Sequence, residues 1–375
     1  MLEREELEAK YRYESNYVED VAVFKQKISD KSIIPHQVEI QPGPLGNRIC
    51  WLECPFCYGK SANDTGERLL LSRYIEVLNE IADGGCNKII VAGWATDPLN
   101  YTNIDDLVET IIKRNQIIGF NTRALRMSDR LIELLSSSSV SSDSYLSVSI
   151  DAGSDKVYNK VHDVQSDAKL YSRVLHNIER LASKKANYGA SLDISAAYLI
   201  NDFNYMIEEV KSFINDFKSA GCSVLRFSFP QLPRGDEPGT NPSIPNLSNC
   251  HQYVQNLKPY IDDCSNSTCK VIIIEPDLYI KPRTTPCFAR FIYPTIGFDG
   301  SLYHCSQSAG PNFRAMSLGN LTNENFWDLY YNYDVRDYEL YFETSTKCME
   351  ECNCRCDRKE HTVNESIIDN EFLNV

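Results

Sequence analysis

The chain has 375 residues, which is long enough for one large domain or two ordinary ones. Lys and Arg total 38 and Asp and Glu total 52, so the formal net charge is −14. This negative charge argues against binding of nucleic acid through a broad basic face. No apolar segment is long enough to cross a bilayer, and the charged, acidic N-terminus is unlike a signal peptide. We therefore expect a cytoplasmic protein that binds neither membranes nor nucleic acid.

Fourteen cysteines are the unusual feature of the composition. In a reducing compartment so many thiols rarely form disulfides, which leaves packing, metal binding or redox chemistry as their roles. Cys86 and Cys222 belong to no cysteine array and lie at predicted helix–strand turns. We expect these two to be buried as small apolar side chains.

Hydrophobic periodicity predicts alternating strands and helices. Residues 1–35 are polar and helical in pattern, as in an N-terminal helical extension. From residue 36 to 229 about six β–α units follow, which predicts a parallel sheet covered by helices, either doubly wound or a partial barrel, with ligands at the carboxyl ends of its strands. The expected strands are 36–40, 88–92, 117–122, 145–150, 193–200 and 224–227, and the expected helices are 69–82, 104–114, 128–136, 171–183 and 204–220.

The character of the sequence changes after residue 229. Prolines and glycines crowd residues 230–249, and we interpret 230–286 as a linker or insertion with a helix near 250–261 and a strand at 270–275. Residues 287–375 are expected to form a small α+β unit with a hairpin near 291–305 and a helix at 323–333. Asp299-Gly300 predicts a type I′ turn, which would place Cys305 on the returning strand.

Cys50, Cys54 and Cys57 form a CxxxCxxC array directly after the first predicted strand. Three thiolates on one loop can hold three irons of a cubane cluster and leave the fourth iron without a protein ligand. A zinc knuckle is one alternative, although zinc requires four ligands and no fourth Cys or His lies close in sequence. Three ordinary buried thiols are a second alternative.

This array, on the loop after the first strand of a β/α series, resembles the radical S-adenosylmethionine (radical SAM) superfamily. The resemblance covers residues 36–229 in strand order and spacing, and it implies a partial (β/α)6 TIM-like barrel with a [4Fe-4S] cluster on the three cysteines. Residues 91–98 resemble the glycine-rich segment of the family, whose acidic residue holds the methionyl amino group, with Asp97 in place of the usual glutamate. Ser149-Ile-Asp151 resembles the S-x-D segment of the family, which lies near the ribose hydroxyls. The resemblance implies that S-adenosylmethionine (SAM) is bound by Phe56, Tyr58, Gly93, Trp94, Thr96, Asp97, Asn121, Ser149 and Asp151.

A second group of cysteines lies in the C-terminal region. Residues 280–357 resemble the SPASM or twitch extension of radical SAM enzymes, which binds one or two auxiliary iron–sulfur clusters. We expect at least one such cluster here, held by four of the six candidate thiols, and a structural zinc site on the same cysteines is the alternative. The candidates favoured as ligands are Cys287, Cys305, Cys348, Cys352 and Cys354, and Cys356 is the sixth thiol of the group.

The resemblance also implies an activity: reductive cleavage of SAM to a 5′-deoxyadenosyl radical that abstracts a hydrogen atom from the substrate. An electron donor such as flavodoxin or ferredoxin is implied as a partner. A ribosomally synthesised peptide, modified in natural-product biosynthesis, is the favoured substrate. Oxidation, epimerisation or elimination on a sugar or aminocyclitol is the alternative, and a non-catalytic iron–sulfur or zinc scaffold is the second. The sequence assigns no catalytic acid, base or hydrogen donor.

Overall fold

The computed structural model describes most of the chain, namely residues 2–11, 18, 20–43, 50, 52–57, 66–164, 167–230, 243–275, 287–334, 363, 364 and 367. Two compact units can be distinguished within the chain. The first comprises residues 1–41, 62–90 and 279–375, and the second comprises 42–61 and 91–278. Across the described ranges, no helix has both the length and the apolar character required to cross a membrane.

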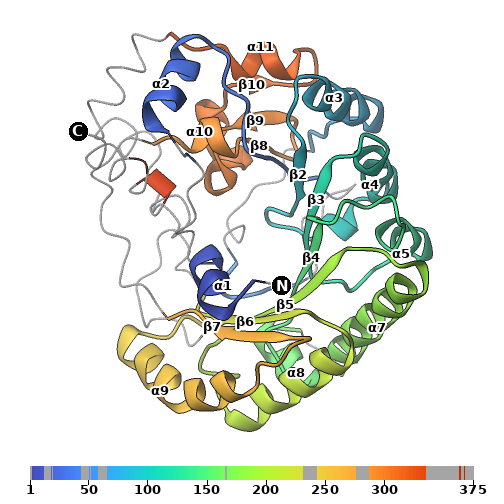
Figure 1. The fold of residues 1–375 in the computed structure, drawn as a ribbon, viewed down its shortest axis with the longest axis vertical. Helices are drawn as coiled ribbons and strands as arrows, with labels where there is room; N and C mark the ends of the chain where they lie inside the picture. The colour runs from blue at the N-terminus through green and yellow to red at the C-terminus, as the bar shows by residue number, and fades with distance from the viewer. Residues whose placement is uncertain are drawn as a thin grey trace. The chain divides into compact units, whose positions relative to one another are not determined.

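The second unit is built from strands that alternate with helices (Figure 1). Its strands run parallel in the order β3 (Ile117–Thr122), β4 (Tyr145–Ser149), β5 (Asp193–Leu199), β6 (Val224–Ser228) and β7 (Lys270–Ile273). Its helices are η1 (Pro98–Asn100), α4 (Ile104–Lys113), α5 (Asp129–Leu135), α6 (Asp155–Val161), α7 (Leu170–Tyr188), α8 (Ile207–Ser219) and α9 (Leu247–Asp263). The predicted fold class, mixed α/β with an open parallel sheet like that of a partial barrel, is confirmed.

Strand β7 lies outside the range 36–229 in which the parallel sheet was expected. Its register with β6 aligns Val224 with Lys270 and Phe227 with Ile273. The apolar run of β7 is buried from Val271 onward, as expected for a strand added to a parallel sheet. The segment interpreted as a linker or insertion therefore contributes both α9 and a further sheet strand.

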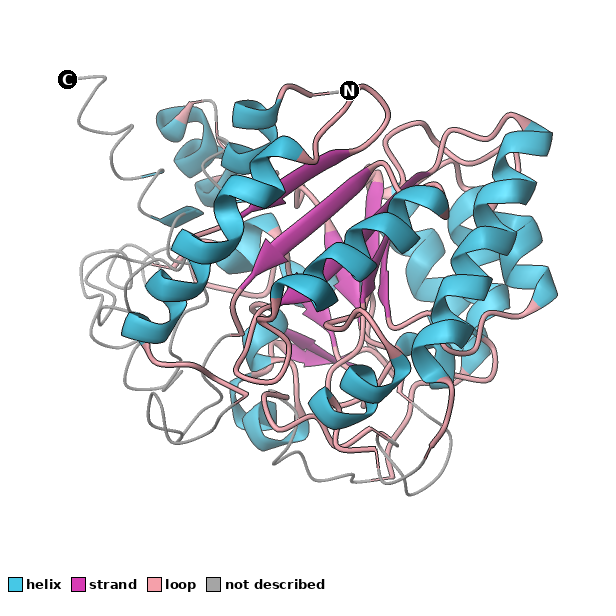
Figure 2. Cartoon of the chain, turned by 90° about the horizontal axis from the view of Figure 1, so that it is seen from below, coloured by secondary structure: helices cyan, strands magenta, loops and turns pink. Residues whose placement is uncertain are grey.

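The two faces of this sheet differ in polarity. On one face Phe120, Leu146 and Val148 are fully buried. The helices of the unit lie along the outer side of its strands (Figures 1 and 2). On the other face the register aligns Asn121 with Ser147, and these side chains are only half-buried. Successive strand residues point to opposite sides. The alternation therefore leaves a polar, partly accessible face at the centre of the unit.

The first unit contains strands that run in mixed directions. Its strand order is β10 (Gly319–Asn320), β9 (Ser301–Tyr303), β8 (Thr295–Ile296), β1 (Val38–Ile40) and β2 (Lys88–Val91). β1 and β8 are parallel, whereas β9 runs antiparallel to β8 and to β10. Its helices are α1 (Arg4–Tyr11), α2 (Val21–Ser29), α3 (Leu71–Asp83), α10 (Ala289–Ile292), η2 (Ser306–Ser308), η3 (Pro311–Met316) and α11 (Phe326–Tyr330).

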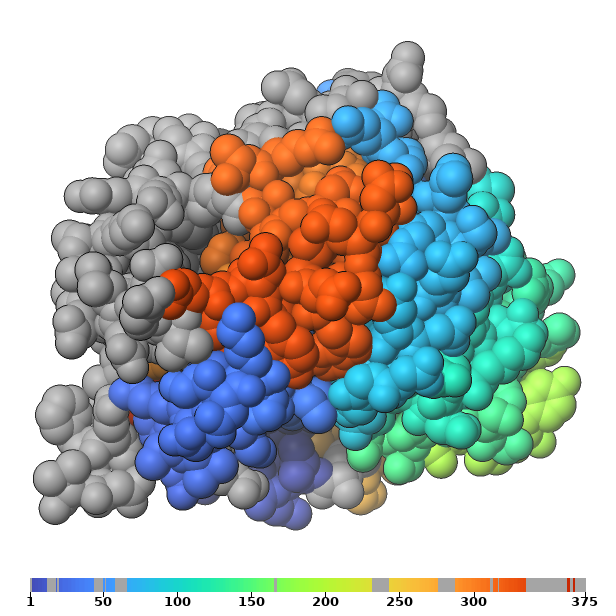
Figure 3. Space-filling view, turned by 90° about the horizontal axis from the view of Figure 1, so that it is seen from above, coloured from blue at the N-terminus to red at the C-terminus, as the bar shows by residue number. Residues whose placement is uncertain are grey.

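Helix α11 of this unit packs on α3, as the adjoining orange and light-blue surfaces show (Figure 3). The indole Nε1 of Trp327 donates to the Glu80 carbonyl oxygen at 2.7 Å, and the Phe326 amide donates to the Glu80 carboxylate at 2.8 Å. Arg73 pairs with the same carboxylate at 2.7 Å. The aromatic helix predicted near 323–333 is therefore a packed structural element, fixed by Glu80.

The predicted hairpin exists, but its predicted turn type was wrong. The loop between β8 and β9 spans residues 297–300, and the Gly300 amide donates to the Gly297 carbonyl oxygen at 3.0 Å. Gly300 has φ of +81°, whereas Asp299 does not adopt a positive φ. A type I′ turn requires positive φ at both central residues, so this loop is a tight turn followed by a left-handed glycine. Cys305 lies two residues beyond the end of β9 rather than within it.

Candidate functional site

The three cysteines of the CxxxCxxC array lie in the second unit, on the loop that follows β1 in the chain. The Cys54 side chain is buried, and those of Cys50 and Cys57 are half-buried. The Cys57 amide donates to the Cys54 carbonyl oxygen at 3.1 Å, which closes a turn through Pro55 and Phe56. The structure therefore brings the three thiols onto one short, folded segment.

Burial controls the protonation of these thiols. It raises the pKa of Cys50, and it raises the pKa of Cys54 to about 12. Nearby thiolates contribute in the same direction, since Cys57 raises the pKa of both neighbours. The metal-free thiols of Cys50 and Cys54 are therefore protonated at neutral pH, and the charge of each neighbouring thiolate acts on them. Metal binding deprotonates such thiols, because the cation stabilises the thiolate far more than burial destabilises it.

The donor set fits an iron–sulfur cluster held by three cysteines. A structural zinc ion requires four ligand atoms around one point, whereas a cubane binds each thiolate through a different iron. Among the described residues, no three His, Cys, Asp or Glu side chains surround a single point as a mononuclear metal site would require. Three thiols on one loop suit the cubane by their number, because a zinc site would lack its fourth ligand.

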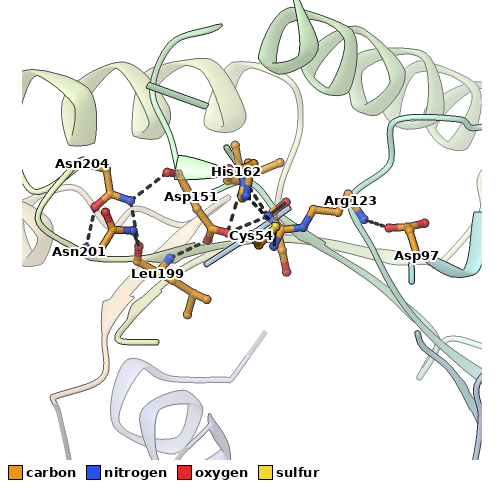
Figure 4. A network of polar contacts seen from close by, with 10 residues as sticks. Cys54, Asp97, Arg123, Asp151, His162, Leu199, Asn201 and Asn204 are labelled. Atoms are coloured by element: carbon orange, nitrogen blue, oxygen red, sulfur yellow. Dashed lines mark hydrogen bonds and ion pairs between the residues drawn. The ribbon is translucent and has the colours of Figure 1, made fainter. Parts of the chain in front are cut away.

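Cys54 begins a chain of polar contacts that extends into the unit (Figure 4). Its Sγ lies 3.2 Å from His162 Nδ1, and His162 Nε2 lies 2.9 Å from Arg123 Nη1. Arg123 Nη1 also donates to Asp151 Oδ2 at 2.8 Å. Burial, followed by the charge of Arg123, lowers the pKa of His162 well below its usual 6.5. His162 is therefore neutral at physiological pH, and the positive charge that acts on Cys54 is that of Arg123, whose Nη2 lies 3.9 Å from Cys54 Sγ.

Asp151 anchors this chain of contacts at the carboxyl end of β4. Its side chain is fully buried, and its backbone has a left-handed φ of +59°. The Leu199 amide donates to Asp151 Oδ1 at 2.8 Å, and Asn204 Nδ2 donates to the Asp151 carbonyl oxygen at 2.9 Å. Aspartate tolerates a left-handed conformation when local hydrogen bonds hold it. The structure gives this carboxylate protein partners, and its implied place near the ribose hydroxyls stays a prediction.

Asp97, which follows β2 in the chain, also accepts hydrogen bonds from residues at the strand ends. Its carboxylate accepts hydrogen bonds from the Leu99 amide at 2.9 Å, from Thr122 Oγ1 at 2.9 Å and from the Arg123 amide at 2.5 Å. Arg123 is therefore held at both ends, through its amide by Asp97 and through its guanidinium by Asp151. An ionised carboxylate accepts about four hydrogen bonds, so Asp97 keeps little capacity for a ligand. Its implied contact with the methionyl amino group stays a prediction.

The segment before Asp97 is a tight turn. A Cβ on Gly93 would lie 1.8 Å from the Thr96 carbonyl oxygen, and Ala95 has a left-handed φ of +57°. The indole Nε1 of Trp94 is buried and has no hydrogen-bond partner among the described residues. A buried donor that stays unpaired costs about 1–3 kcal/mol, so a ligand acceptor at this position would be favourable.

We expect Gly93→Ala to destabilise the protein by about 3 kcal/mol, because the turn cannot accommodate a Cβ without moving its own backbone. Gly189→Ala is the matched control. A Cβ on Gly189 would meet no atom within 4 Å, so only the φ of +64° at this position opposes a side chain. Its replacement should cost about 1 kcal/mol. Thermal unfolding of the metal-free proteins measures both values, and equal losses would contradict the steric argument.

The remaining predicted SAM-binding residues lie at or near the strand ends. Asn121 and Ser149 are half-buried on the polar face of the sheet, and the Phe56 ring lies 6.1 Å from the His162 ring. Thr96 Oγ1 accepts a hydrogen bond from Asn100 Nδ2 at 3.2 Å. Tyr58 lies outside the described residues.

Only two of the predicted auxiliary cysteines can be placed, and both belong to the first unit. Cys287 is half-buried, with its Sγ 3.8 Å from Asn364 Nδ2. Cys305 is buried, with its Sγ 3.7 Å from Ser308 Oγ. The tail cysteines lie outside the described residues, namely Cys348, Cys352, Cys354 and Cys356. The composition of an auxiliary cluster site therefore stays a prediction.

Sequence reasoning missed two residues of the site, Arg123 and His162. Arg123 directly follows Asn121-Thr122 at the carboxyl end of a predicted strand, where ligand-contacting side chains gather. His162 is one of only six histidines, and it directly follows the helix after the Ser-x-Asp segment. Either position could have been marked as a candidate, but nothing in the sequence indicates that the two side chains meet.

Comparisons with known proteins agree with this geometry. Residues 46–194 match the model of the Radical SAM superfamily, a range that contains the cysteine loop, Asp97, Arg123, Asp151 and His162. None of the curated protein sequences matches the chain.

Solved structures share the fold at low sequence identity. SuiB of Streptococcus suis bound to S-adenosylmethionine matches with a TM-score of 0.60 and 15% identity, covering 95% of this chain and 81% of SuiB. SuiB bound to its precursor peptide SuiA matches with a TM-score of 0.59 and 14% identity, over 92% and 78%. anSMEcpe with bound AdoMet and Cp18Cys peptide matches with a TM-score of 0.56 and 15% identity, over 90% and 97%. Residues 46–194 of this chain therefore resemble the Radical SAM superfamily, and the chain shares its fold with these solved structures.

Proposed function

We propose that this protein is a radical SAM enzyme that reductively cleaves SAM and abstracts a hydrogen atom from a peptide substrate. One observation carries the proposal: a CxxxCxxC loop, within the segment that matches the Radical SAM family, whose central cysteine is held at the carboxyl ends of parallel strands. Ligands of parallel α/β sheets bind at that edge.

Each group of residues has a proposed task. Cys50, Cys54 and Cys57 hold the [4Fe-4S] cluster. The turn 93–97 offers SAM the unpaired Trp94 Nε1, and Asn121 and Ser149 border the nucleoside from the polar face. When bound, the cluster and SAM supply the one-electron chemistry that yields a 5′-deoxyadenosyl radical, and the protein positions them and excludes water.

We propose a ribosomally made peptide as the substrate class and a flavodoxin or ferredoxin as the electron donor. The support for the peptide is the fold, since SuiB is solved with a precursor peptide and anSMEcpe with the Cp18Cys peptide. The C-terminal cysteines are proposed to hold at least one auxiliary iron–sulfur cluster that takes up the electron left on the substrate radical.

The activity is tested by anaerobic reconstitution of the full chain with iron and sulfide, followed by SAM and dithionite. The proposal predicts 5′-deoxyadenosine and methionine in equal amounts. A protein that binds iron or zinc but forms no 5′-deoxyadenosine would be a scaffold, and the proposal would then be wrong.

The substrate class has its own test. Extract from cells grown in D2O is divided by size into a peptide fraction and a small-molecule fraction, and each is incubated with the enzyme and unlabelled SAM. Deuterium in 5′-deoxyadenosine should come from the peptide fraction and disappear after protease treatment. Deuterium from the small-molecule fraction alone would favour a sugar or aminocyclitol substrate.

The auxiliary cluster is tested by counting iron. We expect the reconstituted wild-type protein to hold about eight iron atoms and the double variant Cys287→Ala/Cys305→Ala about four, since each cubane contains four. Cys222→Ala is the control, because this buried thiol belongs to neither proposed site. An unchanged iron count in the double variant would show that these two cysteines hold no cluster.

A further inference from the structure

We infer that His162 donates a hydrogen bond from Nδ1 to the sulfur of Cys54, and so positions this cluster ligand and raises the reduction potential of the cluster. The inference rests on the proposed function, because it concerns the cluster that Cys50, Cys54 and Cys57 are proposed to hold. It assigns His162 a positioning role that neither the motif nor the family match contains.

His162 contacts the cysteine loop at several points. Its Nδ1 lies 3.2 Å from Cys54 Sγ, and its backbone carbonyl oxygen accepts from the Glu53 amide at 3.3 Å. Its ring lies 6.1 Å from the Phe56 ring. His162 itself is fixed, since it caps the C-terminus of α6 and its ring packs edge-on against Tyr158 at 4.3 Å. The residue therefore supports the central part of the loop through backbone and side chain together.

The neighbours of His162 determine which ring nitrogen carries the proton. Arg123 Nη1 lies 2.9 Å from Nε2, and a guanidinium can only donate hydrogen bonds. Nε2 must therefore accept, which leaves the proton on Nδ1, directed at the Cys54 sulfur. The Ile150 carbonyl oxygen lies 3.2 Å from the same Nε2 and would favour the opposite tautomer. Arg123 Nη1 is closer to Nε2 than this carbonyl oxygen and is permanently charged, so the tautomer with the proton on Nδ1 is the more stable one.

Two aspartates hold the Arg123 side chain in this position. Asp97 accepts from its amide and Asp151 pairs with its guanidinium at 2.8 Å, so the side chain is held across the strand ends. Its Nη2 also lies 3.9 Å from Cys54 Sγ. A reduced cluster carries one more negative charge than an oxidised one. Hydrogen bonds and positive charge at a ligand sulfur stabilise the reduced form and raise the potential.

Two variants separate the hydrogen bond from packing. His162→Leu removes the donor, whereas His162→Asn retains an amide nitrogen near the position of Nδ1. We expect His162→Leu to lower the midpoint potential of the SAM-responsive cluster in an EPR-monitored redox titration, and His162→Asn to restore it close to the wild-type value. Equal midpoint potentials in wild type and His162→Leu, with the cluster retained, would overturn the inference.

A second measurement applies if the leucine variant does not fold. In wild-type holoenzyme labelled with 15N-histidine, ENDOR on the part of the EPR signal that changes with SAM should show a weak 15N coupling and an exchangeable proton. Their absence would contradict the hydrogen bond. If no part of the signal responds to SAM, the proposed function fails instead, so the two failures are distinguishable.

Discussion

Replacing Cys54 with alanine is expected to abolish formation of 5′-deoxyadenosine, down to the level of a reaction without protein. The variant loses one of only three thiolates, and it also leaves His162 Nδ1 without its partner at 3.2 Å. The expected loss of iron is about four atoms per chain, because a cubane with two protein ligands is not retained. Iron analysis and chromatography of the SAM products measure the two effects.

Cys222→Ala is the matched control for this experiment. Cys222 is 3% exposed, and burial raises its pKa far above the usual value, so it is an inert thiol in the same unit. The control should keep its iron and its activity. Residual cleavage of SAM by Cys54→Ala, well above the protein-free reaction, would show that the cluster is held elsewhere.

Arg123→Met should destabilise the protein by about 3–5 kcal/mol, because it leaves the fully buried Asp151 carboxylate without its charged partner. Arg130→Met is the control, since Arg130 forms its ion pairs with Asp106 and Glu109 on the surface. Exposed pairs contribute about 0–1 kcal/mol. Denaturant unfolding of the metal-free proteins gives both values. Similar losses in the two variants would show that the Arg123–Asp151 pair is not buried in solution.

Much of the second unit could be predicted from the sequence, because the hydrophobic pattern of each strand or helix lies within one short segment. The apolar runs at 117–122 and 145–150 became β3 and β4, and the stripe of apolar residues after Asn204 became α8. The burial of Cys86 and Cys222, at 1% and 3% exposure, is also confirmed. Each of these expectations depended on the spacing of apolar residues within one segment. That spacing indicates both the type of element and the face of it that is buried.

The side-chain network could not be predicted in the same way. Cys54 and His162 are 108 residues apart, and Arg123 and Asp151 meet only because β3 and β4 are adjacent in the sheet. A single sequence contains no signal for such pairs. The predicted type I′ turn at Asp299-Gly300 was wrong for another reason. The dipeptide favours this turn locally. In the structure buried Asp299 accepts hydrogen bonds from Ser301 and Tyr303, and of the two turn residues only Gly300 adopts a positive φ.

The central claim is that three cysteines leave one iron of the cluster open to SAM. The most direct test is the EPR spectrum of the dithionite-reduced Cys287→Ala/Cys305→Ala variant, recorded with and without SAM. We predict a spectrum from one cluster that changes when SAM is added, because the open iron gains a new ligand. A reduced cluster whose spectrum is unaffected by saturating SAM would contradict the claim.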